Sequence, residues 1–316
     1  MFASVIIPNY NGWHLLAVCL AALRRQTYPA FEVVVVDNGS TDGSVDLVRR
    51  HFPEVRVIAL PENRRFCGAV NAGIRATTGE VVALLNNDTE PEPAWLAELC
   101  RALAEHPEVG LCASKILLYD RRDILHTAGD YYTLAGLPGN RGVWQKDDGR
   151  YDRPEYVFGA CAGAAAYRRA LFEDIGLFDE DFEAYCEDVD FNLRAQLAGY
   201  RCLYVPTARV YHRLSATGGG PAASYYCGRN FLWVIAKSLP GEIIRRHWWR
   251  IVGAQVRLAL EALWHVREPA ARARLRGQID GLRGLPRMLR KRPAVQARRR
   301  VPVAALEALL AQAPGS

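Results

Sequence analysis

Short runs of β-branched apolar residues alternate with helix-patterned segments through the first half of this 316-residue chain, and this alternation constrains the fold more than any other feature. The segments between the runs carry leucines and valines at helical spacing, so they are expected to pack on a sheet. Such alternation is typical of an α/β fold with a doubly wound, mostly parallel sheet. The predicted strands are residues 5–8, 33–37, 55–59 and 81–86.

Polar residues follow three of these strands at the point where each strand ends. The stretches are residues 9–12, 37–43 and 87–89. Ligands of open α/β sheets bind beyond the carboxyl ends of the strands, so we expect the three stretches to form one crevice. An ordinary strand-to-helix turn would explain each stretch equally well if it stood alone.

Two carboxylates in these stretches have the chemistry of a nucleotide site. Asp37 ends a strand, where it can accept a hydrogen bond from a pyrimidine ring N–H. Asp88 offers the hard oxygen that Mg²⁺ or Mn²⁺ requires, and one protein carboxylate leaves coordination positions open for a diphosphate. The stretches therefore predict a site for a metal-bound nucleoside diphosphate.

A third acidic cluster lies further along the chain, between Glu183 and Asp190. It includes Glu187 and Asp188 and is interleaved with aromatic residues. A partly desolvated carboxylate in such surroundings can act as a general base. Capping of a helix N-terminus by acidic side chains explains the same pattern, and both interpretations stay open.

The ordered set of these stretches resembles the family-2 glycosyltransferases with the GT-A fold, especially the rhamnosyltransferase-like branch. The likeness covers about residues 3–235, and each landmark is weak without the others. The landmarks are Ile-Pro-Asn-Tyr-Asn at 7–11, Gln-Thr-Tyr-Pro at 26–29, Val-Asp-Asn-Gly-Ser-Thr-Asp at 36–42, Asn-Asn-Asp at 86–88, Gly-Leu-Phe-Asp-Glu at 176–180, Glu-Asp-Val-Asp at 187–190 and Tyr-His at 211–212.

The resemblance implies a role for each matching residue on the donor side. Tyr10 stacks on the nucleobase and Asp37 binds its edge, while Asp88 and His212 hold Mg²⁺ or Mn²⁺ on the diphosphate. His212 is expected just after a strand at residues 208–211. The further residues assigned to the nucleotide are Asn9, Asn11, Asn38, Asn63, Asn71, Asn86 and Asn87.

On the acceptor side, the resemblance makes Asp188 the catalytic base and Glu187 the residue that orients the acceptor hydroxyl. The implied reaction is an inverting, metal-dependent transfer of a sugar from a nucleoside diphosphate, with dTDP-rhamnose or a UDP-hexose as donor. The implied acceptor is lipid-linked or a polysaccharide. Because the stretch at 86–88 supplies one carboxylate, metal affinity is expected to be weak, which increases the importance of His212.

The chain is expected to divide into a GT-A catalytic domain at residues 1–235 and a basic helical extension at 236–316. From Lys237 to Arg300 there are seventeen Lys or Arg residues against four acids, a balance of +13, so the rest of the chain carries −7 of the total of +6. Pro269, Pro286 and Pro293 are expected to divide the extension into short helices.

The extension also combines tryptophans with arginines, which favours contact with a membrane surface over an oligomer interface. The oligomeric state is left open. Dispersed cysteines and the lack of a secretory signal favour a cytoplasmic protein, attached peripherally to the inner face of the cell membrane. Nucleic-acid binding is disfavoured because the catalytic part is net acidic.

Three other functions fit the sequence less well. A sugar-nucleotide pyrophosphorylase requires basic residues in the loop after the first strand, and residues 9–13 contain none. A dinucleotide-dependent oxidoreductase requires a Gly-x-Gly-x-x-Gly turn at that place, which is missing. A non-catalytic sugar-nucleotide-binding assembly protein needs no base, so Asp188 and His212 argue against it.

Overall fold

The computed structural model describes residues 1–214 and 219–313. The chain forms two compact units: unit 1 comprises Met1–Asp130, Asn140–Glu183 and Tyr200–Thr217, and unit 2 comprises Tyr131–Gly139, Ala184–Gly199 and Gly218–Ser316. The units interleave in sequence, and each is described by itself below. The functional boundary near residue 235 stays a prediction.

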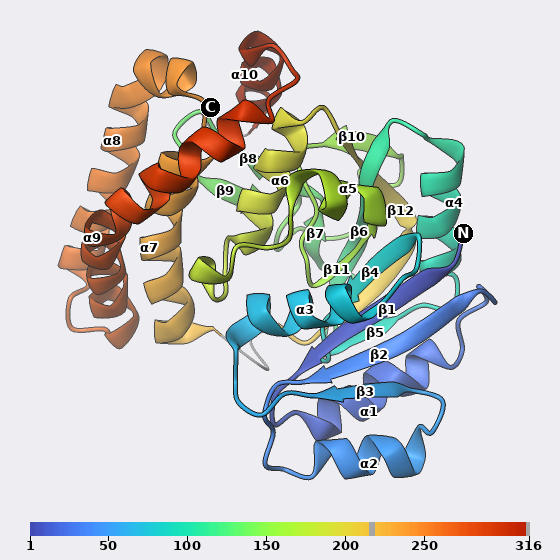
Figure 1. The fold of residues 1–316 in the computed structure, drawn as a ribbon. Helices are drawn as coiled ribbons and strands as arrows, with labels where there is room; N and C mark the ends of the chain where they lie inside the picture. The colour runs from blue at the N-terminus through green and yellow to red at the C-terminus, as the bar shows by residue number, and fades with distance from the viewer. Residues whose placement is uncertain (215–218, 314–316) are drawn as a thin grey trace. The chain divides into compact units, whose positions relative to one another are not determined.

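Unit 1 is built on a mixed sheet in which the first strands of the chain run parallel (Figure 1). Strand β1 pairs in parallel with both β2 and β4, and β2 pairs in parallel with β3. These are the four predicted strands, which are therefore confirmed. In spatial order the sheet reads β10 (Glu155–Val157), β12 (Arg201–His212), β6 (Val109–Leu118), β11 (Ala164–Arg168), β4 (Val81–Leu85), β1 (Ala3–Asn9), β2 (Phe31–Asp37) and β3 (Arg56–Ala59).

Helices cover both faces of this sheet, as expected of a doubly wound fold. On one face, Leu16 of α1 and Trp95 of α4 are fully buried with Val5 of the sheet. On the other face α3 lies so close that a Cβ on Gly73 would stand 2.4 Å from Ile6. The helices of unit 1 are α1 (Trp13–Leu23), α2 (Ser44–His51), α3 (Arg65–Ala76), α4 (Trp95–Glu105), α5 (Arg169–Ile175) and the 3₁₀ turn η1 (Glu180–Phe182).

Two short strands of unit 1, neither of them predicted, bring distant residues to the end of the sheet. Strand β5 (Thr89–Pro91) pairs antiparallel with β12, and β7 (Leu125–Ala128) pairs antiparallel with β6. A further two-stranded ladder joins β8 (Asp130–Tyr132) to β9 (Pro138–Asn140).

Unit 2 is mainly helical. Helices α7 and α9 approach closely because glycines line their contact: a Cβ on Gly277 would lie 2.0 Å from the carbonyl oxygen of Tyr225. Among the described residues, no helix has the length and apolar character needed to cross a membrane. The helices are α6 (Glu187–Leu197), α7 (Gly220–Lys237), α8 (Gly241–Trp264), α9 (Pro269–Ala297) and α10 (Val303–Ala311).

The prediction that prolines divide the extension into short helices is wrong for α9. Pro269 occupies its first turn, where a missing N–H costs nothing, but Pro286 and Pro293 lie inside a continuous helix of 29 residues. Both interior prolines are exposed, so water can reach the carbonyl groups that lose a partner. Packing of α9 along α7 therefore outweighs the local preference to break.

Candidate active site

The ends of β1, β2 and β4 are joined by a buried chain of side-chain hydrogen bonds in unit 1. Asn87 Nδ2 donates to Asn9 Oδ1 at 2.8 Å, and Asn9 Nδ2 donates to Asp37 Oδ2 at 3.2 Å. The backbone N–H of Ser40 donates to the other carboxylate oxygen of Asp37 at 2.9 Å. The structure therefore brings Asn9, Asp37 and Asn87 together, as the polar strand ends predicted.

The loops beside this chain are held by the other predicted asparagines. Asn11 adopts a left-handed backbone with φ 49°, and its Oδ1 accepts from the N–H of Thr41 at 2.7 Å. Asn38 Nδ2 donates to Asn63 Oδ1 at 3.1 Å. Tyr10 remains 50% exposed, so its ring presents a free face in the described structure.

Asn86 and Asn71 have different surroundings. The N–H of Asn86 donates to Gly163 O at 2.9 Å, across the junction between β4 and β11. Asn71 is buried in α3, where its Nδ2 donates to Phe178 O at 2.8 Å and its Oδ1 accepts from the N–H of Phe178 at 3.2 Å. The amide of Asn71 thus holds the chain near η1, and its assignment to the nucleotide stays a prediction.

Asp88 and His212 meet at the same end of the sheet. His212 Nε2 lies 3.1 Å from Asp88 Oδ1, and both side chains are largely buried. The register explains the meeting: β5 begins directly after Asp88, and its Thr89 stands opposite His212 on β12. His212 is the last residue of β12 and not, as expected, a residue that follows the strand.

A second histidine, which is not among the predicted site residues, completes this group. His126 Nδ1 lies 3.1 Å from His212 Nδ1, and the two rings are 5.0 Å apart. Burial, followed by the nearby His212, lowers the pKa of His126 to about 3, so its ring is neutral at neutral pH. The local sequence gives no signal for this histidine, because the four residues of β7 are too few to predict a strand.

The acidic cluster begins α6, in unit 2. Asp188 Oδ1 accepts from the N–H of Val189 at 2.8 Å, as a residue in the first turn of a helix can. Asp190 is fully buried, and its carboxylate binds Lys237 Nζ at 2.7 Å and Arg194 Nε at 2.9 Å. Asp190 therefore has a structural role, which separates it from its two neighbours.

Glu187 is buried beside Asp188. Burial, and then repulsion from Asp188, raise the pKa of Glu187 well above its ordinary value of 4.5. Its Oε2 has no hydrogen-bond partner among the residues described. Two adjacent carboxyl groups in unequal surroundings are a common arrangement in acid–base sites.

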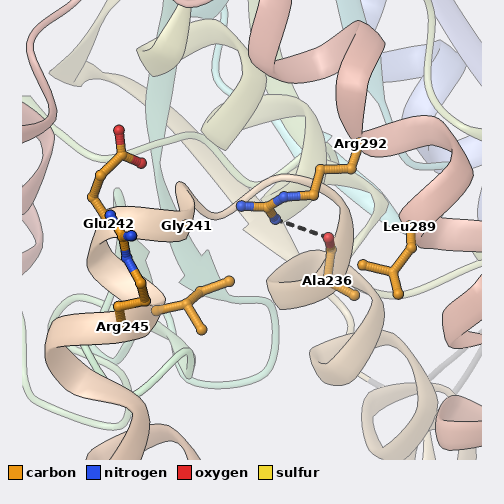
Figure 2. A pocket seen from close by; sticks show the side chains of 7 residues that line it. Ala236, Gly241, Glu242, Arg245, Leu289 and Arg292 are labelled. Atoms are coloured by element: carbon orange, nitrogen blue, oxygen red, sulfur yellow. Dashed lines mark hydrogen bonds between the residues drawn. The ribbon is translucent and has the colours of Figure 1, made fainter.

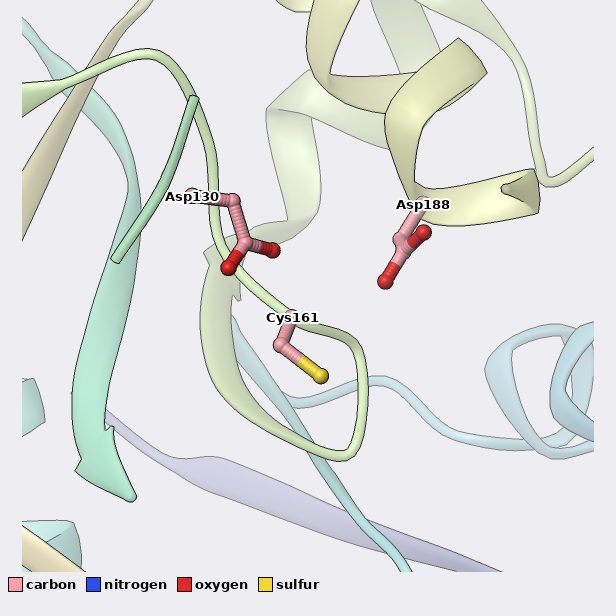
Figure 3. Close-up of side chains that lie close together, drawn as sticks. All are labelled: Asp130, Cys161 and Asp188. Carbon is pink, nitrogen blue, oxygen red and sulfur yellow. The ribbon is translucent and has the colours of Figure 1, made fainter. Parts of the chain in front are cut away.

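Figure 3 labels Asp188 together with Asp130 and Cys161, both of which belong to unit 1. Asp130 is buried in its own unit, where its Oδ1 accepts from Thr127 Oγ1 at 2.8 Å and from Asn140 Nδ2 at 3.0 Å. With these two hydrogen bonds, Asp130 Oδ1 stabilises the turn that follows β7.

The fold and the strand-end residues define the class of the protein. An α/β sheet of this topology, with buried polar side chains at the carboxyl ends of its strands, matches the GT-A fold of the glycosyltransferases. The sequence model described as "Glycosyl transferase family 2" matches residues 4–176. The chain belongs to this family of glycosyltransferases.

Individual relatives agree with the family. The N-acetylglucosaminyl-diphospho-decaprenol L-rhamnosyltransferase of Mycobacterium tuberculosis is 28% identical over 78% of this chain and 86% of its own length. The O-antigen biosynthesis protein RfbC of Myxococcus xanthus is 31% identical over 71% of this chain, which spans 18% of that protein. The solved mannosyltransferase PcManGT of Pyrobaculum calidifontis, in complex with GDP-Man and Mn²⁺, is 22% identical, with a TM-score of 0.55 over 97% of this chain and 78% of its own.

Proposed function

We propose that the protein is an inverting, metal-dependent glycosyltransferase whose donor is dTDP-rhamnose or a UDP-hexose. The observation that carries the proposal is the adjacency of Asp88 and His212, 3.1 Å apart, at the end of the sheet that also holds the Asp37–Asn9–Asn87 chain. The Mycobacterium tuberculosis relative, an N-acetylglucosaminyl-diphospho-decaprenol L-rhamnosyltransferase, supports rhamnose as the sugar and a lipid-linked acceptor. A polysaccharide acceptor is the second choice.

The residues present fit a divalent cation such as Mn²⁺ or Mg²⁺. Asp88 offers a carboxylate oxygen and His212 an imidazole nitrogen, and the burial of both favours a compensating cation. A bound cation would neutralise charge on the departing diphosphate. The small number of protein ligands leaves coordination positions for the oxygens of the diphosphate.

Protein side chains bind the nucleobase, accept the proton and orient the acceptor in the proposed reaction. The Asp37 carboxylate accepts an N–H from the edge of the nucleobase, and the exposed Tyr10 ring stacks on its face. Asp188 takes the proton from the acceptor hydroxyl as it attacks, and a single displacement inverts the anomeric carbon. Glu187, whose raised pKa favours its protonated form, donates a hydrogen bond that orients the acceptor.

The same proposal assigns residues 1–235 to catalysis and residues 236–316 to attachment. A lipid-linked acceptor lies at a membrane surface, so we place the enzyme in the cytoplasm, on the inner face of the cell membrane. The basic composition of the extension supports this assignment, since the headgroups of that leaflet are anionic.

The donor is tested by thermal stabilisation, because a ligand that binds only the native state raises its melting temperature. The protein is heated with dTDP-rhamnose, UDP-glucose or GDP-mannose, each with Mn²⁺ and with a chelator. We expect Mn²⁺-dependent stabilisation by dTDP-rhamnose or the UDP-sugar and none by GDP-mannose. Equal stabilisation with the chelator would contradict the metal assignment.

The base is tested with Asp188→Asn, which keeps the size of the side chain and removes its proton affinity. Transfer is expected to fall by at least about 10²-fold, the lower range of general-base effects, while the donor Kd measured by calorimetry changes little. Unchanged turnover would remove Asp188 from the role of base.

A further inference from the structure

Helix α8 in unit 2 has an apolar stripe exposed to solvent. Its buried side is formed by Ile251, Ala254 and Ala262. On the other side, large apolar side chains recur at intervals of three or four residues, with exposed fractions of 49% to 87%. They are Trp248, Trp249, Val252, Val256, Leu260, Leu263 and Trp264.

Helix α9 repeats the pattern and adds a row of cations. Its buried residues, among them Gly281 and Met288, face away from an exposed apolar row of Ile279, Leu282 and Leu289. Exposed arginines at intervals of three, four or seven residues border this row, at about 60–120° from it around the helix. They are Arg272, Arg276, Arg283, Arg287 and Arg290.

The two helices run antiparallel and lie side by side (Figure 1). Gln278 Nε2 donates to Gln255 O at 3.1 Å near the middle of the pair, and Arg299 near the end of α9 reaches Glu242 at the start of α8 at 3.1 Å. On an ideal helix each residue advances by about 100° around the axis. Counted from Gln255 in the chain direction, the exposed apolar row of α8 is centred about 90° around that helix. Counted from Gln278 in the same way, the row of α9 is centred about 60° around its helix. Because the helices are antiparallel, these rotations bring both rows to the same side of the pair.

A hollow of about 540 Å³ adjoins this surface, with Leu289 on its wall (Figure 2). Two of its lining residues are arginines, Arg245 and Arg292. The Arg292 guanidinium is partly fixed, since its Nη1 donates to Ala236 O at 2.9 Å. Cations therefore lie both along the apolar face and at its margin.

The combination of the exposed apolar rows with the arginine row of α9 determines which partner fits this face. A second copy of the chain, paired through this face about a two-fold axis, would bring arginine rows near one another and be repelled. A nucleic acid would satisfy the arginines and leave the apolar rows in water. An anionic bilayer satisfies both, since the apolar side chains enter the acyl boundary while the arginines meet the headgroups.

We propose that the face formed by the exposed apolar residues of α8 and α9, with the arginine row of α9, docks on an anionic lipid bilayer and lies in its interface. This deepens the proposed membrane attachment by naming the surface that makes the contact. Binding is measured without donor or acceptor, so its failure is distinguishable from failure of the proposed transfer reaction.

The test is flotation of the full chain with phosphatidylcholine vesicles, with and without phosphatidylglycerol. We expect partition into the anionic vesicles that weakens with salt, and little into the neutral ones. The double variant Leu260→Ser with Trp264→Ser should lower partition by about tenfold or more. The matched control is Phe2→Ser with Trp144→Ser, which removes two exposed apolar side chains of unit 1 and should leave partition unchanged.

A third variant, Arg276→Gln with Arg283→Gln, should reduce the preference for anionic over neutral vesicles. Circular dichroism checks that each variant is folded, which is expected because all the substituted side chains are exposed. Equal partition of the α8 variant and its control would overturn the proposal. So would a dimer in sedimentation that the α8 variant dissociates, or binding of a DNA duplex in place of vesicles.

Discussion

The strand-end site of unit 1 and the α8–α9 face of unit 2 depart from ordinary protein architecture in opposite ways. In unit 1, Asn9, Asp37, Asn87 and Asp88 are polar and nearly fully buried. In unit 2, the rows on α8 and α9 are apolar and exposed. Buried polar groups and large exposed apolar patches both cost free energy, so each is informative about a missing partner.

The difference shows which kind of partner each region requires. The buried amides and carboxylates of unit 1 are already hydrogen-bonded to one another, so they are preorganised for a small polar ligand that inserts among fixed groups. The exposed apolar rows of unit 2 make contacts that need no fixed partner geometry, so they suit a broad, fluid surface. Substitutions at the strand ends of unit 1 should therefore act on ligand affinity, and substitutions in the exposed rows of unit 2 should act on attachment.

The largest effect is expected from Asp88→Asn in unit 1. The amide keeps the shape of the side chain but removes the one carboxylate at the proposed metal site, so transfer should fall by about 10³-fold or more. Calorimetric titration of donor with Mn²⁺ should show weakened binding, while the melting temperature without ligand stays within a few degrees of the parent. A variant that retains Mn²⁺-dependent donor affinity would remove Asp88 from the metal site.

Asp190→Ala in unit 2 is expected to lower the stability of the protein, in contrast to Asp88→Asn, which should lower ligand binding. Its carboxylate is fully buried between Lys237 and Arg194, which outweigh the effect of burial and lower its pKa. Removing it takes a counter-charge away from two buried cations, so the free energy of unfolding should fall by about 3–5 kcal/mol, as measured by urea denaturation.

The matched control for this substitution is Asp46→Ala, which breaks an exposed helical ion pair with Arg49 at 3.7 Å. Exposed pairs contribute less than about 1 kcal/mol, so this variant should unfold close to the parent. Similar losses of unfolding free energy in both variants would mean that the buried ion pairs of Asp190 stabilise the protein no more than an exposed ion pair does.

Most of the parallel part of the fold could be predicted from sequence. Apolar runs such as residues 33–37 have a period and length that few other structures share, and polar residues after them mark the strand ends. The short strands β5 and β7 could not be predicted in this way. Their three or four residues carry no period of their own, and their pairing with β12 and β6 depends on contacts far apart in the chain.

The same limit explains what was missed at the site. Asp37, Asn9 and Asn87 follow predicted strands, so their meeting followed from the topology of the sheet. His126 reaches His212 only through β7 and β6, and no local pattern signals that pairing. The continuous α9 shows the same principle, because its interior prolines are tolerated only as a result of packing against α7.

His126 gives a sharper test of the unit 1 site. When a cation binds His212 Nε2, the ring must carry its proton on Nδ1, and His126 Nδ1 at 3.1 Å is placed to accept that proton in a hydrogen bond. His126→Phe removes the acceptor and should weaken Mn²⁺ affinity by about 10–100-fold. His126→Gln, whose amide oxygen can accept the bond, should recover part of the loss, whereas equal affinity in both variants would reduce His126 to a packing residue.

The smallest effect is expected from a substitution of Glu187, the residue of unit 2 that is proposed to orient the acceptor. Its folded pKa is raised above 4.5, so the native state holds a proton that the unfolded state releases. Stability from this group is therefore complete below about pH 4.5 and is lost progressively as the pH rises towards the folded pKa. Glu187→Gln removes the titration and should raise the free energy of unfolding at pH 8 by on the order of 1 kcal/mol, with little change at pH 4.

Asp188→Asn separates the two causes of the raised pKa. Burial is the larger cause and repulsion from Asp188 the next, so removing that charge should reduce, but not abolish, the loss of stability expected in the parent as the pH rises above about 5. A slope that vanished in Asp188→Asn would make repulsion the dominant cause. A slope unchanged in Glu187→Gln would assign the pH dependence to another group and leave Glu187 ionised, which would end its proposed role as a hydrogen-bond donor to the acceptor.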